Sequence, residues 1–212
     1  MTRRGKKLPR AFYTRSETLL VARELLGKRL VVPTTEGVRV SGIVVETEAY
    51  LAPEDKASHA YNHRRTARTE TMFARGGTAY VYFIYGMYFQ FNVVTNVQEV
   101  PHAVLVRAVE PDEGLELMIA RRGATDARNV ASGPGKLCIA LGIDRSYNGE
   151  DLMGTRVWME DCGRNFSDDE IEAGRRVGID YAGEFVDKPW RFWVRGNPHV
   201  SRVGRKTSKA SS

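Results

Sequence analysis

The chain has 212 residues, of which 42% are hydrophobic and 27% are charged, a composition typical of a folded globular protein. This length exceeds the roughly 150 residues of an average domain by less than half, so we expect one domain with its own core. No apolar run approaches the ~20 residues of a membrane helix, and no apolar leader follows the charged N-terminus. The two cysteines form no metal-binding pattern with histidine. We therefore expect neither a membrane protein nor a secreted one, and neither a zinc site nor a disulfide framework.

The formal net charge of +6 is concentrated at the two ends of the chain. Residues 1–10 and residues 195–212 each carry five basic side chains and no acidic one. Because these ends hold ten positive charges, the body from residue 11 to residue 194 has a net charge of −4. Two interpretations are open: arms that contact a polyanion, or flexible ends that keep the protein soluble. Either one predicts basic flexible tails at 1–10 and 204–212 around a single domain at 11–203.

Hydrophobic patterns and turn residues predict the elements in chain order. They are a helix from a Ser16 cap through Leu26, a hairpin of 28–33 and 38–50, a second hairpin of 79–85 and 88–95 with Gly86 at its turn, a strand at 103–109, a helix from an Asp112 cap to Arg122, a short helix at Lys136–Leu141 and a last strand at 190–195. Strands do not alternate regularly with helices, which favours an α+β fold. We expect a single mixed domain around a mainly antiparallel β-sheet with flanking helices.

Two carboxylates share one face of the long strand at 43–50. The two-residue period of a strand places Glu46, Glu48 and Tyr50 on the same side. A carboxylate within an apolar strand is costly unless it is paired or lies at a cleft, so at least one glutamate is expected to be functional. The alternative is a solvated strand face with both glutamates exposed.

The segment from Tyr80 to Asn92 contains four of the nine tyrosines and three of the eight phenylalanines. With Gly86 as the turn, Tyr85 and Met87 lie at the tip of the hairpin and Tyr82 lies within its first strand. A large side chain at the tip suggests a wedge that inserts into stacked bases, and Tyr82 could be a stacking platform. The alternative is ordinary cross-strand packing of aromatic side chains.

The segment 59–75 is rich in arginine, histidine and threonine and contains one acid, Glu70. Arginine and hydroxyl side chains in an irregular segment are suited to phosphate contacts, although a solvated basic loop remains possible.

Arg107 lies in the otherwise apolar strand at 103–109, where a cation needs an anionic partner. Glu46, Glu48 or Glu110 could be that partner. A carboxylate held by a buried arginine, an aromatic slot, a wedge and a basic rim fit an enzyme that extrudes a nucleotide from a duplex and acts on it.

Five segments resemble the alkyladenine (3-methyladenine) DNA glycosylase family. The resemblance extends from about Pro9 to Ser201 and keeps the order of the family's motifs. The segments are Val45–Tyr50 (VETEAY), Ala79–Tyr88 (AYVYFIYGMY), Leu105–Pro111 (LVRAVEP), Ser132–Cys138 (SGPGKLC) and Arg191–Pro198 (RFWVRGNP).

This resemblance implies a monofunctional glycosylase that flips alkylated or deaminated purines out of double-stranded DNA, cuts their N-glycosidic bond and leaves an abasic site. It implies a curved sheet, a monomer, no membrane, and neither metal nor redox cofactor. The expected location is the cytoplasm, or the nucleoid of a prokaryote. Two other functions remain open: a non-catalytic protein that binds damaged DNA, and a hydrolase that acts on RNA or nucleotides.

The resemblance also implies a role for each residue of the site. Glu48 would be the general base that activates the attacking water, and Arg107 and the backbone carbonyl of Val177 would hold that water. The pocket for the flipped base would be lined by Tyr50, His59, Tyr82, Asn92 and Leu105, with Asn92 disfavouring the 2-amino group of guanine. The wedge would consist of Tyr85 and Met87. The DNA backbone would be contacted by Arg64, Thr66 and Arg68.

The sequence departs from the family pattern near the proposed pocket. Ala67 replaces a frequent proline, Gln90 replaces a frequent cysteine, and Asn62 and His63 lie in a loop that is often rich in glycine. These departures affect the expected lesion range and affinity more than the reaction type.

Overall fold

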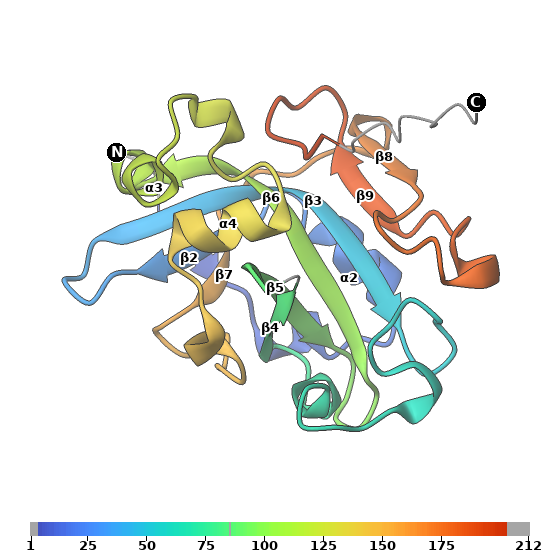
Figure 1. Cartoon of the computed structure of the whole chain (residues 1–212). Coiled ribbons are helices and arrows are strands. Elements are labelled where there is room, and N and C mark those ends of the chain that lie inside the picture. The colour runs from blue at the N-terminus through green and yellow to red at the C-terminus, as the bar shows by residue number, and fades with distance from the viewer. Residues whose placement is uncertain (1–3, 85, 203–212) are drawn as a thin grey trace.

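The computed structural model describes residues 4–84 and 86–202, which form one nine-stranded sheet with four helices around it (Figure 1). The strands are β1 (Lys6–Lys7), β2 (Arg29–Pro33), β3 (Arg39–Leu51), β4 (Ala79–Ile84), β5 (Tyr88–Thr95), β6 (His102–Glu113), β7 (Trp158–Asp161), β8 (Ile171–Gly174) and β9 (Arg191–Val194). The helices are α1 (Arg10–Tyr13), α2 (Thr18–Glu24), α3 (Leu115–Arg122) and α4 (Pro134–Leu141).

The sheet runs in the order β1-β7-β2-β3-β6-β5-β4, and every pairing between described strands is antiparallel. β3 is the central strand: β6 pairs along one side of it, while β2 and then β9 pair along the other. β8 continues the sheet beyond β9. The predicted α+β class and the mainly antiparallel sheet are confirmed.

Both predicted hairpins form, as β2 with β3 and as β4 with β5. The expected strand at 103–109 lies within β6, and that at 190–195 corresponds to β9, which is one residue shorter at each end. The short helix predicted at Lys136–Leu141 is α4, which begins two residues earlier, at Pro134. α4 crosses one face of the sheet and α2 lies behind β3 on the other (Figure 1).

The prediction that Ser16 caps a helix extending to Leu26 is wrong in detail. α2 begins at Thr18 and ends at Glu24, with Glu17 at the N-cap position. No described side chain caps the first turn of the helix, and the Ser16 hydroxyl donates a hydrogen bond to the Glu17 carboxylate. A charged neighbour is the stronger partner for this hydroxyl.

The predicted Asp112 cap is also wrong, because β6 continues through Asp112 to Glu113 and keeps pairing with β3. The Asp112 carboxylate forms an ion pair with Nε of Arg29 at 2.6 Å instead. α3 begins only after Gly114, which adopts a left-handed conformation with φ of 74°. Pairing across the sheet therefore overrides a local capping preference.

Part of the expected N-terminal tail packs on the domain. Lys6 and Lys7 pair with β7, and Leu8 is buried in the core. Arg10 begins α1, forms an ion pair with Asp151 and donates a hydrogen bond to the carbonyl of Gly76. Residues 204–212, the expected C-terminal tail, lie outside the described residues.

The core fills both faces of the sheet around β3, β5 and β6, where Val44, Phe91 and Val106 are fully buried. α4 approaches β5 closely at Gly135, where a Cβ atom would lie only 2.9 Å from the ring of Tyr88. The SGPGK segment therefore needs its small residue for packing against the β4–β5 hairpin. This packing positions the hairpin beside the pocket described next.

Candidate active site

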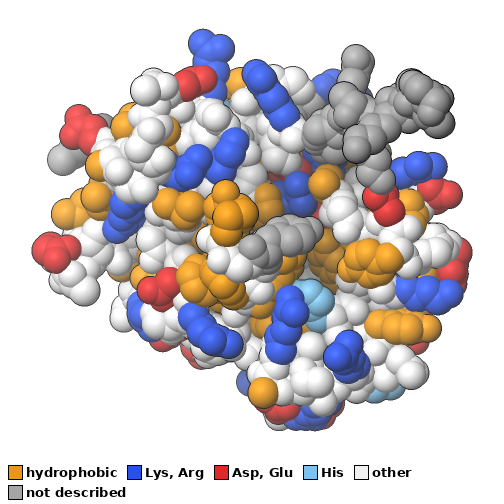
Figure 2. Space-filling view, in the orientation of Figure 1, with side chains coloured by type: hydrophobic (Ala, Val, Ile, Leu, Met, Phe, Trp, Pro, Cys, Tyr) orange, Lys and Arg blue, Asp and Glu red, His pale blue; other side chains and the backbone are white. Residues whose placement is uncertain are grey.

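A pocket opens over β3, β6, β5 and β4, between the chain segments 57–59 and 177–181, and has a volume of about 100 Å³. On the face shown in Figure 2, basic and hydrophobic side chains gather around a central hollow. Most residues expected to form the site line this pocket: Glu48, Tyr50, His59, Tyr82, Asn92, Leu105, Arg107 and Val177. The structure therefore brings together segments that are up to 129 residues apart in the sequence.

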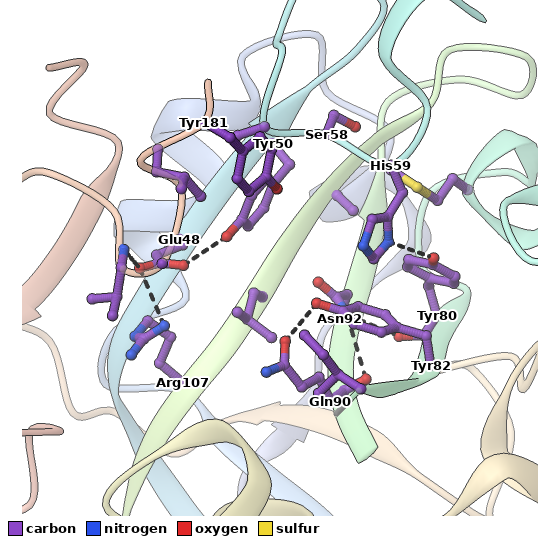
Figure 3. A pocket seen from close by; sticks show the side chains of 18 residues that line it. Glu48, Tyr50, Ser58, His59, Tyr80, Tyr82, Gln90, Asn92, Arg107 and Tyr181 are labelled. Carbon is purple, nitrogen blue, oxygen red and sulfur yellow. Dashed lines mark hydrogen bonds and ion pairs between the residues drawn. The ribbon is translucent and has the colours of Figure 1, made fainter. Parts of the chain in front are cut away.

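Glu48 on β3 is fully buried and lies at the inner end of the pocket (Figure 3). Its Oε2 accepts a hydrogen bond from the Tyr50 hydroxyl at 2.8 Å. Its Oε1 accepts one from the backbone N–H of Val177 at 2.8 Å and lies 3.2 Å from Nη1 of Arg107. Burial and the nearby Glu48 charge raise the pKa of Tyr50, so this hydroxyl stays protonated as a donor.

Arg107 on β6 pairs with both Glu46 and Glu48, and not with Glu110. Glu110 instead binds Arg164, at 2.9 Å. Both strand glutamates are fully buried, so the alternative of a solvated strand face is wrong. Burial alone would lower the pKa of Arg107, but Glu48 and Glu46 outweigh this effect and raise the pKa, which keeps the guanidinium charged.

A second buried ion pair supports the ring of Tyr50. Arg176 lies 4.7 Å from the centre of this ring, and its Nη1 and Nη2 donate to the carboxylate of Asp55 at 2.5 and 2.8 Å. Both charged side chains are fully buried. Arg176 also donates to the carbonyl of Ala49 on β3, so the pair fixes the strand that carries Tyr50 as well as its ring.

His59 and Tyr82 face Tyr50 from the opposite side of the pocket (Figure 3). The rings of His59 and Tyr82 pack edge to face, with their centroids 4.5 Å apart. Nη2 of Arg68 lies 3.4 Å from Nε2 of His59, and Nδ1 lies 2.9 Å from the Tyr80 hydroxyl. Because an arginine can only donate, Nε2 is the acceptor and Nδ1 carries the proton of a neutral ring. Burial, followed by Arg68 and Arg64, lowers the pKa of His59 to about 4.

The lowered pKa of His59 predicts that the free energy of unfolding decreases at acidic pH. The unfolded chain, in which histidine has its ordinary pKa near 6.5, binds more protons than the folded chain between about pH 4 and pH 6.5. Stability is therefore lost as the pH falls through this window, by about 2 kcal/mol from pH 7 to pH 5 for this one group. Urea denaturation at both pH values should show a smaller loss for His59→Gln than for the wild type. Equal losses in the two proteins would contradict the buried neutral ring.

The floor of the pocket is formed by β5 and β6, where Asn92 and Leu105 are paired residues and both buried. Nδ2 of Asn92 donates to the carbonyl of Tyr80 at 3.1 Å, which fixes the orientation of the amide. Gln90 accepts a hydrogen bond from the Tyr82 hydroxyl through Oε1. Gln90 thus holds the hydroxyl of one aromatic ring of the pocket.

A model of the methylpurine-DNA glycosylase (MPG) family matches residues 11–198 of the chain. The chain belongs to this family. Proteins from Desulfitobacterium hafniense (strain Y51) and Alkaliphilus oremlandii (strain OhILAs) are 48% and 47% identical to it over 205 residues, which cover 92% of this chain and 98% and 99% of theirs. A protein from Clostridium acetobutylicum is 48% identical over 203 residues, covering 92% of this chain and 97% of its own. All three are named as predicted 3-methyladenine DNA glycosylases.

These matches confirm the family inferred from the five sequence segments and make the protein a DNA N-glycosylase, a repair hydrolase that acts on DNA. None of the helices in the described part of this glycosylase is both long and apolar enough to cross a membrane. Among residues 4–84 and 86–202, no three His, Cys, Asp or Glu side chains are grouped so that they could hold a metal ion.

The tip of the β4–β5 hairpin carries the residues expected to form the wedge of the glycosylase. Tyr85 lies outside the described residues. Met87 is 65% exposed, and its backbone N–H donates to the carbonyl of Ile84 across the turn. Met87 at this turn does not pack into the core, which is compatible with the expected wedge. That role stays a prediction.

The residues expected to contact the DNA backbone, Arg64, Thr66 and Arg68, are all exposed. Arg65 between them is paired with Glu70 and Glu99, whereas neither Arg64 nor Arg68 forms an ion pair with a described carboxylate. Their charges are therefore available to an external anion.

The loop before these arginines contains two residues in an unusual backbone conformation. Asn62 and His63 both have φ of 55°, in the left-handed region that favours glycine. Asparagine tolerates this region well, whereas histidine does so at a cost of roughly 1 kcal/mol. A glycine at either position would adopt this backbone conformation without that cost.

Some residues of the site escaped sequence reasoning, namely Ser58, Tyr80 and Tyr181, which line the pocket, and Asp55 and Arg176, which support it. Tyr80 was part of the aromatic segment, but its hydrogen bond to His59 joins residues from different loops. The sequence pointed to Arg176 only through its position directly before Val177, whose backbone carbonyl the family resemblance places at the site.

Proposed function

We propose that this glycosylase binds an alkylated or deaminated purine flipped out of double-stranded DNA and hydrolyses its N-glycosidic bond with a water activated by Glu48. The observation that carries the proposal is the buried carboxylate at the inner end of an aromatic pocket. An ionised carboxylate offers about four acceptor positions. Tyr50, Val177 and Arg107 use three of them, so one position on Oε2 is left for a water among the described contacts.

Glu48 would act in two ways. Departure of the purine leaves an oxocarbenium-like sugar, whose positive charge a buried carboxylate stabilises strongly. The same carboxylate can accept a proton from the attacking water. Arg107 and the backbone carbonyl of Val177 are proposed to hold that water, and Nη1 of Arg107 lies 3.2 Å from the Glu48 carboxylate.

The aromatic side chains suit a planar base. A purine between Tyr50 on one side and His59 and Tyr82 on the other would be stacked on both faces, and stacking contributes about 1–3 kcal/mol per base. The neutral state of His59 matters here, because a purine alkylated at N3 or N7 is cationic and would be repelled by an imidazolium. Asn92 and Leu105 would contact the base from the floor of the pocket, with Asn92 disfavouring guanine.

Outside the pocket, Tyr85 and Met87 are proposed to fill the gap that the flipped base leaves in the stack. Arg64, Thr66 and Arg68 are proposed to bind the phosphates beside it. Flipping costs a few kcal/mol, least for damaged or mispaired bases, which adds selectivity before chemistry. We further propose that the protein acts as a monomer, in the cytoplasm or in the nucleoid of a prokaryote, and that 204–212 adds non-specific DNA affinity.

The proposal predicts base release from a panel of duplexes that each contain one lesion. The duplexes carry hypoxanthine, 1,N6-ethenoadenine or 7-methylguanine, and methylated DNA supplies 3-methyladenine. Under single-turnover conditions, alkali should cleave the strand at one lesion at least, and an undamaged duplex should stay intact. If no lesion gives a cut strand or a free base but the duplexes are bound, a non-catalytic protein that binds damaged DNA is the better description.

A further inference from the structure

Beneath the pair of Glu48 and Arg107 lies a third charged residue, Glu46, which has no assigned role. It is fully buried on β3 and accepts four hydrogen bonds. Oε1 accepts from Nε of Arg107 and Nε of Arg191, both at 2.7 Å, and from the Ser201 hydroxyl at 2.8 Å. Oε2 accepts from the backbone N–H of Ser201 at 2.8 Å. Three separate segments, β6, β9 and the chain after β9, therefore meet at one carboxylate.

These contacts determine which part of Arg107 faces Glu48. Nε of Arg107 is bound to Glu46, and Nη2 lies 3.3 Å from the Ser201 hydroxyl. Because the guanidinium is planar, fixing these two nitrogens also fixes the third. That third nitrogen, Nη1, is the one 3.2 Å from Oε1 of Glu48. Without Glu46, Arg107 would be free to turn and form a two-point pair with Glu48, as guanidinium and carboxylate groups prefer.

The charges lead to the same conclusion. Two carboxylates and two guanidiniums balance in this buried cluster, and Glu46 is shared between Arg107 and Arg191. Burial disfavours the charged form of Glu46, but Arg107, Arg191 and the Ser201 hydrogen bonds lower its pKa, so it stays ionised. With Glu46 neutral, Glu48 would be the one anion paired with Arg107 among the described contacts, and its attraction would draw the guanidinium toward it.

The backbone of β3 is irregular at this residue. The pairing of β3 with β6 shifts register on both sides of Glu46, between Val44 and Glu46 and between Glu46 and Thr47. Bulges of this kind re-aim side chains and recur beside active sites. Here the irregular stretch carries Glu46 to the point where β6 and β9 flank the same strand.

We propose that Glu46 is a positioning residue for base excision: it holds Arg107 so that only Nη1 meets Glu48, and it joins Ser201 to the same cluster. Arg191 shares this carboxylate and balances its charge. This inference rests on the proposed function, since it concerns the readiness of Glu48 to activate water. It adds β9 and the chain at residue 201 to the active site, although neither lines the pocket.

The test compares Glu46→Gln with Glu160→Gln, a matched control on β7. Glu160 is also buried and is also bound by two arginines, Arg39 and Arg29, but neither of these arginines lines the pocket, whereas Arg107 does. Both variants remove one buried charge and should lower the urea midpoint. Only Glu46→Gln should slow single-turnover excision at saturating protein, by about 10- to 100-fold, the size of effect that misplacing a reacting group by about 1 Å produces. Its Kd for the lesion duplex should change by less than about threefold, since the stacking residues are untouched.

Ser201→Ala supplies a second variant in case Glu46→Gln does not fold. It removes one hydroxyl from Glu46 and Arg107 and should slow excision by roughly threefold or more with unchanged duplex binding. If a folded Glu46→Gln, or Ser201→Ala in its place, excises within twofold of Glu160→Gln, Glu46 is not a positioning residue while the proposed function stands. If the wild type itself releases no base, the proposed function fails and this inference fails with it.

Discussion

Replacing Glu48 with glutamine is expected to abolish base excision while leaving affinity for a lesion-containing duplex nearly unchanged. The amide has the shape of the carboxylate: its oxygen can accept from the backbone N–H of Val177 in place of Oε1, and its NH2 group can donate to the hydroxyl oxygen of Tyr50 in place of Oε2. It can neither take a proton from water nor stabilise a positive sugar by its charge. General-base catalysis alone contributes about 10²- to 10⁴-fold, so a loss of 10³-fold or more is expected when both roles disappear.

Single-turnover excision and fluorescence anisotropy on the same hypoxanthine duplex would measure the two quantities. Glu184→Gln, at an exposed residue paired with Lys56, should leave both unchanged. A Glu48→Gln protein that excises within tenfold of the wild type would show that another group activates the water. A variant that loses duplex binding and excision together would point to a structural role for Glu48.

Replacing Asp55 with asparagine is expected to cause the largest loss of stability, about 3–5 kcal/mol, because the charge of Arg176 stays buried without its partner. Both side chains of this pair are fully buried. Asp55 also accepts the backbone N–H groups of Leu51 and Ala57, which anchors the chain leaving β3. Since Arg176 packs on the ring of Tyr50, excision should fall together with stability.

Urea denaturation measures the first effect, and single-turnover excision well below the unfolding midpoint measures the second. The double variant Asp55→Asn, Arg176→Gln should lose less than the sum of the two single variants, because it leaves no unpaired charge. A denaturation midpoint equal to that of the wild type would mean that water or another group compensates Arg176. Additive losses would mean that the two side chains act independently.

The parts of the site that follow local rules could be predicted from the sequence. Strand alternation placed Glu48 and Tyr50 on one face, and a single cation in an apolar strand marked Arg107 as paired. The partner of Arg107 stayed open among three glutamates, because alternation fixes a face but not the register between distant strands. The structure resolved it by pairing β3 with β6, which brings Arg107 against two of the three.

Contacts between distant segments could not be predicted in this way. Asp55 and Arg176 are 121 residues apart, and neither lies in a pattern that indicates the other. At Asp112 a local pattern led to a wrong prediction. Its side chain and position favour a helix cap, yet the pairing of β6 with β3 continues past it. Roles that rest on family resemblance, such as those of Val177 and Asn92, stay predictions, although the structure places both residues at the pocket, with the N–H of Val177 bound to Glu48.

The gathering of late residues at Glu46 has a consequence for protein synthesis. Arg191 and Ser201 lie 145 and 155 residues after the carboxylate that binds them. β1 and its partner strand β7 are separated by a similarly long stretch of sequence. Sheets built from such distant pairings fold slowly, because the conformational entropy of closing long loops is lost before the contacts between the strands stabilise the chain. A chain emerging from the ribosome therefore carries Glu48 long before the residues that complete its surroundings. We expect nascent chains that stop before Arg191 to lack glycosylase activity, so that cleavage of N-glycosidic bonds begins only with an almost finished protein.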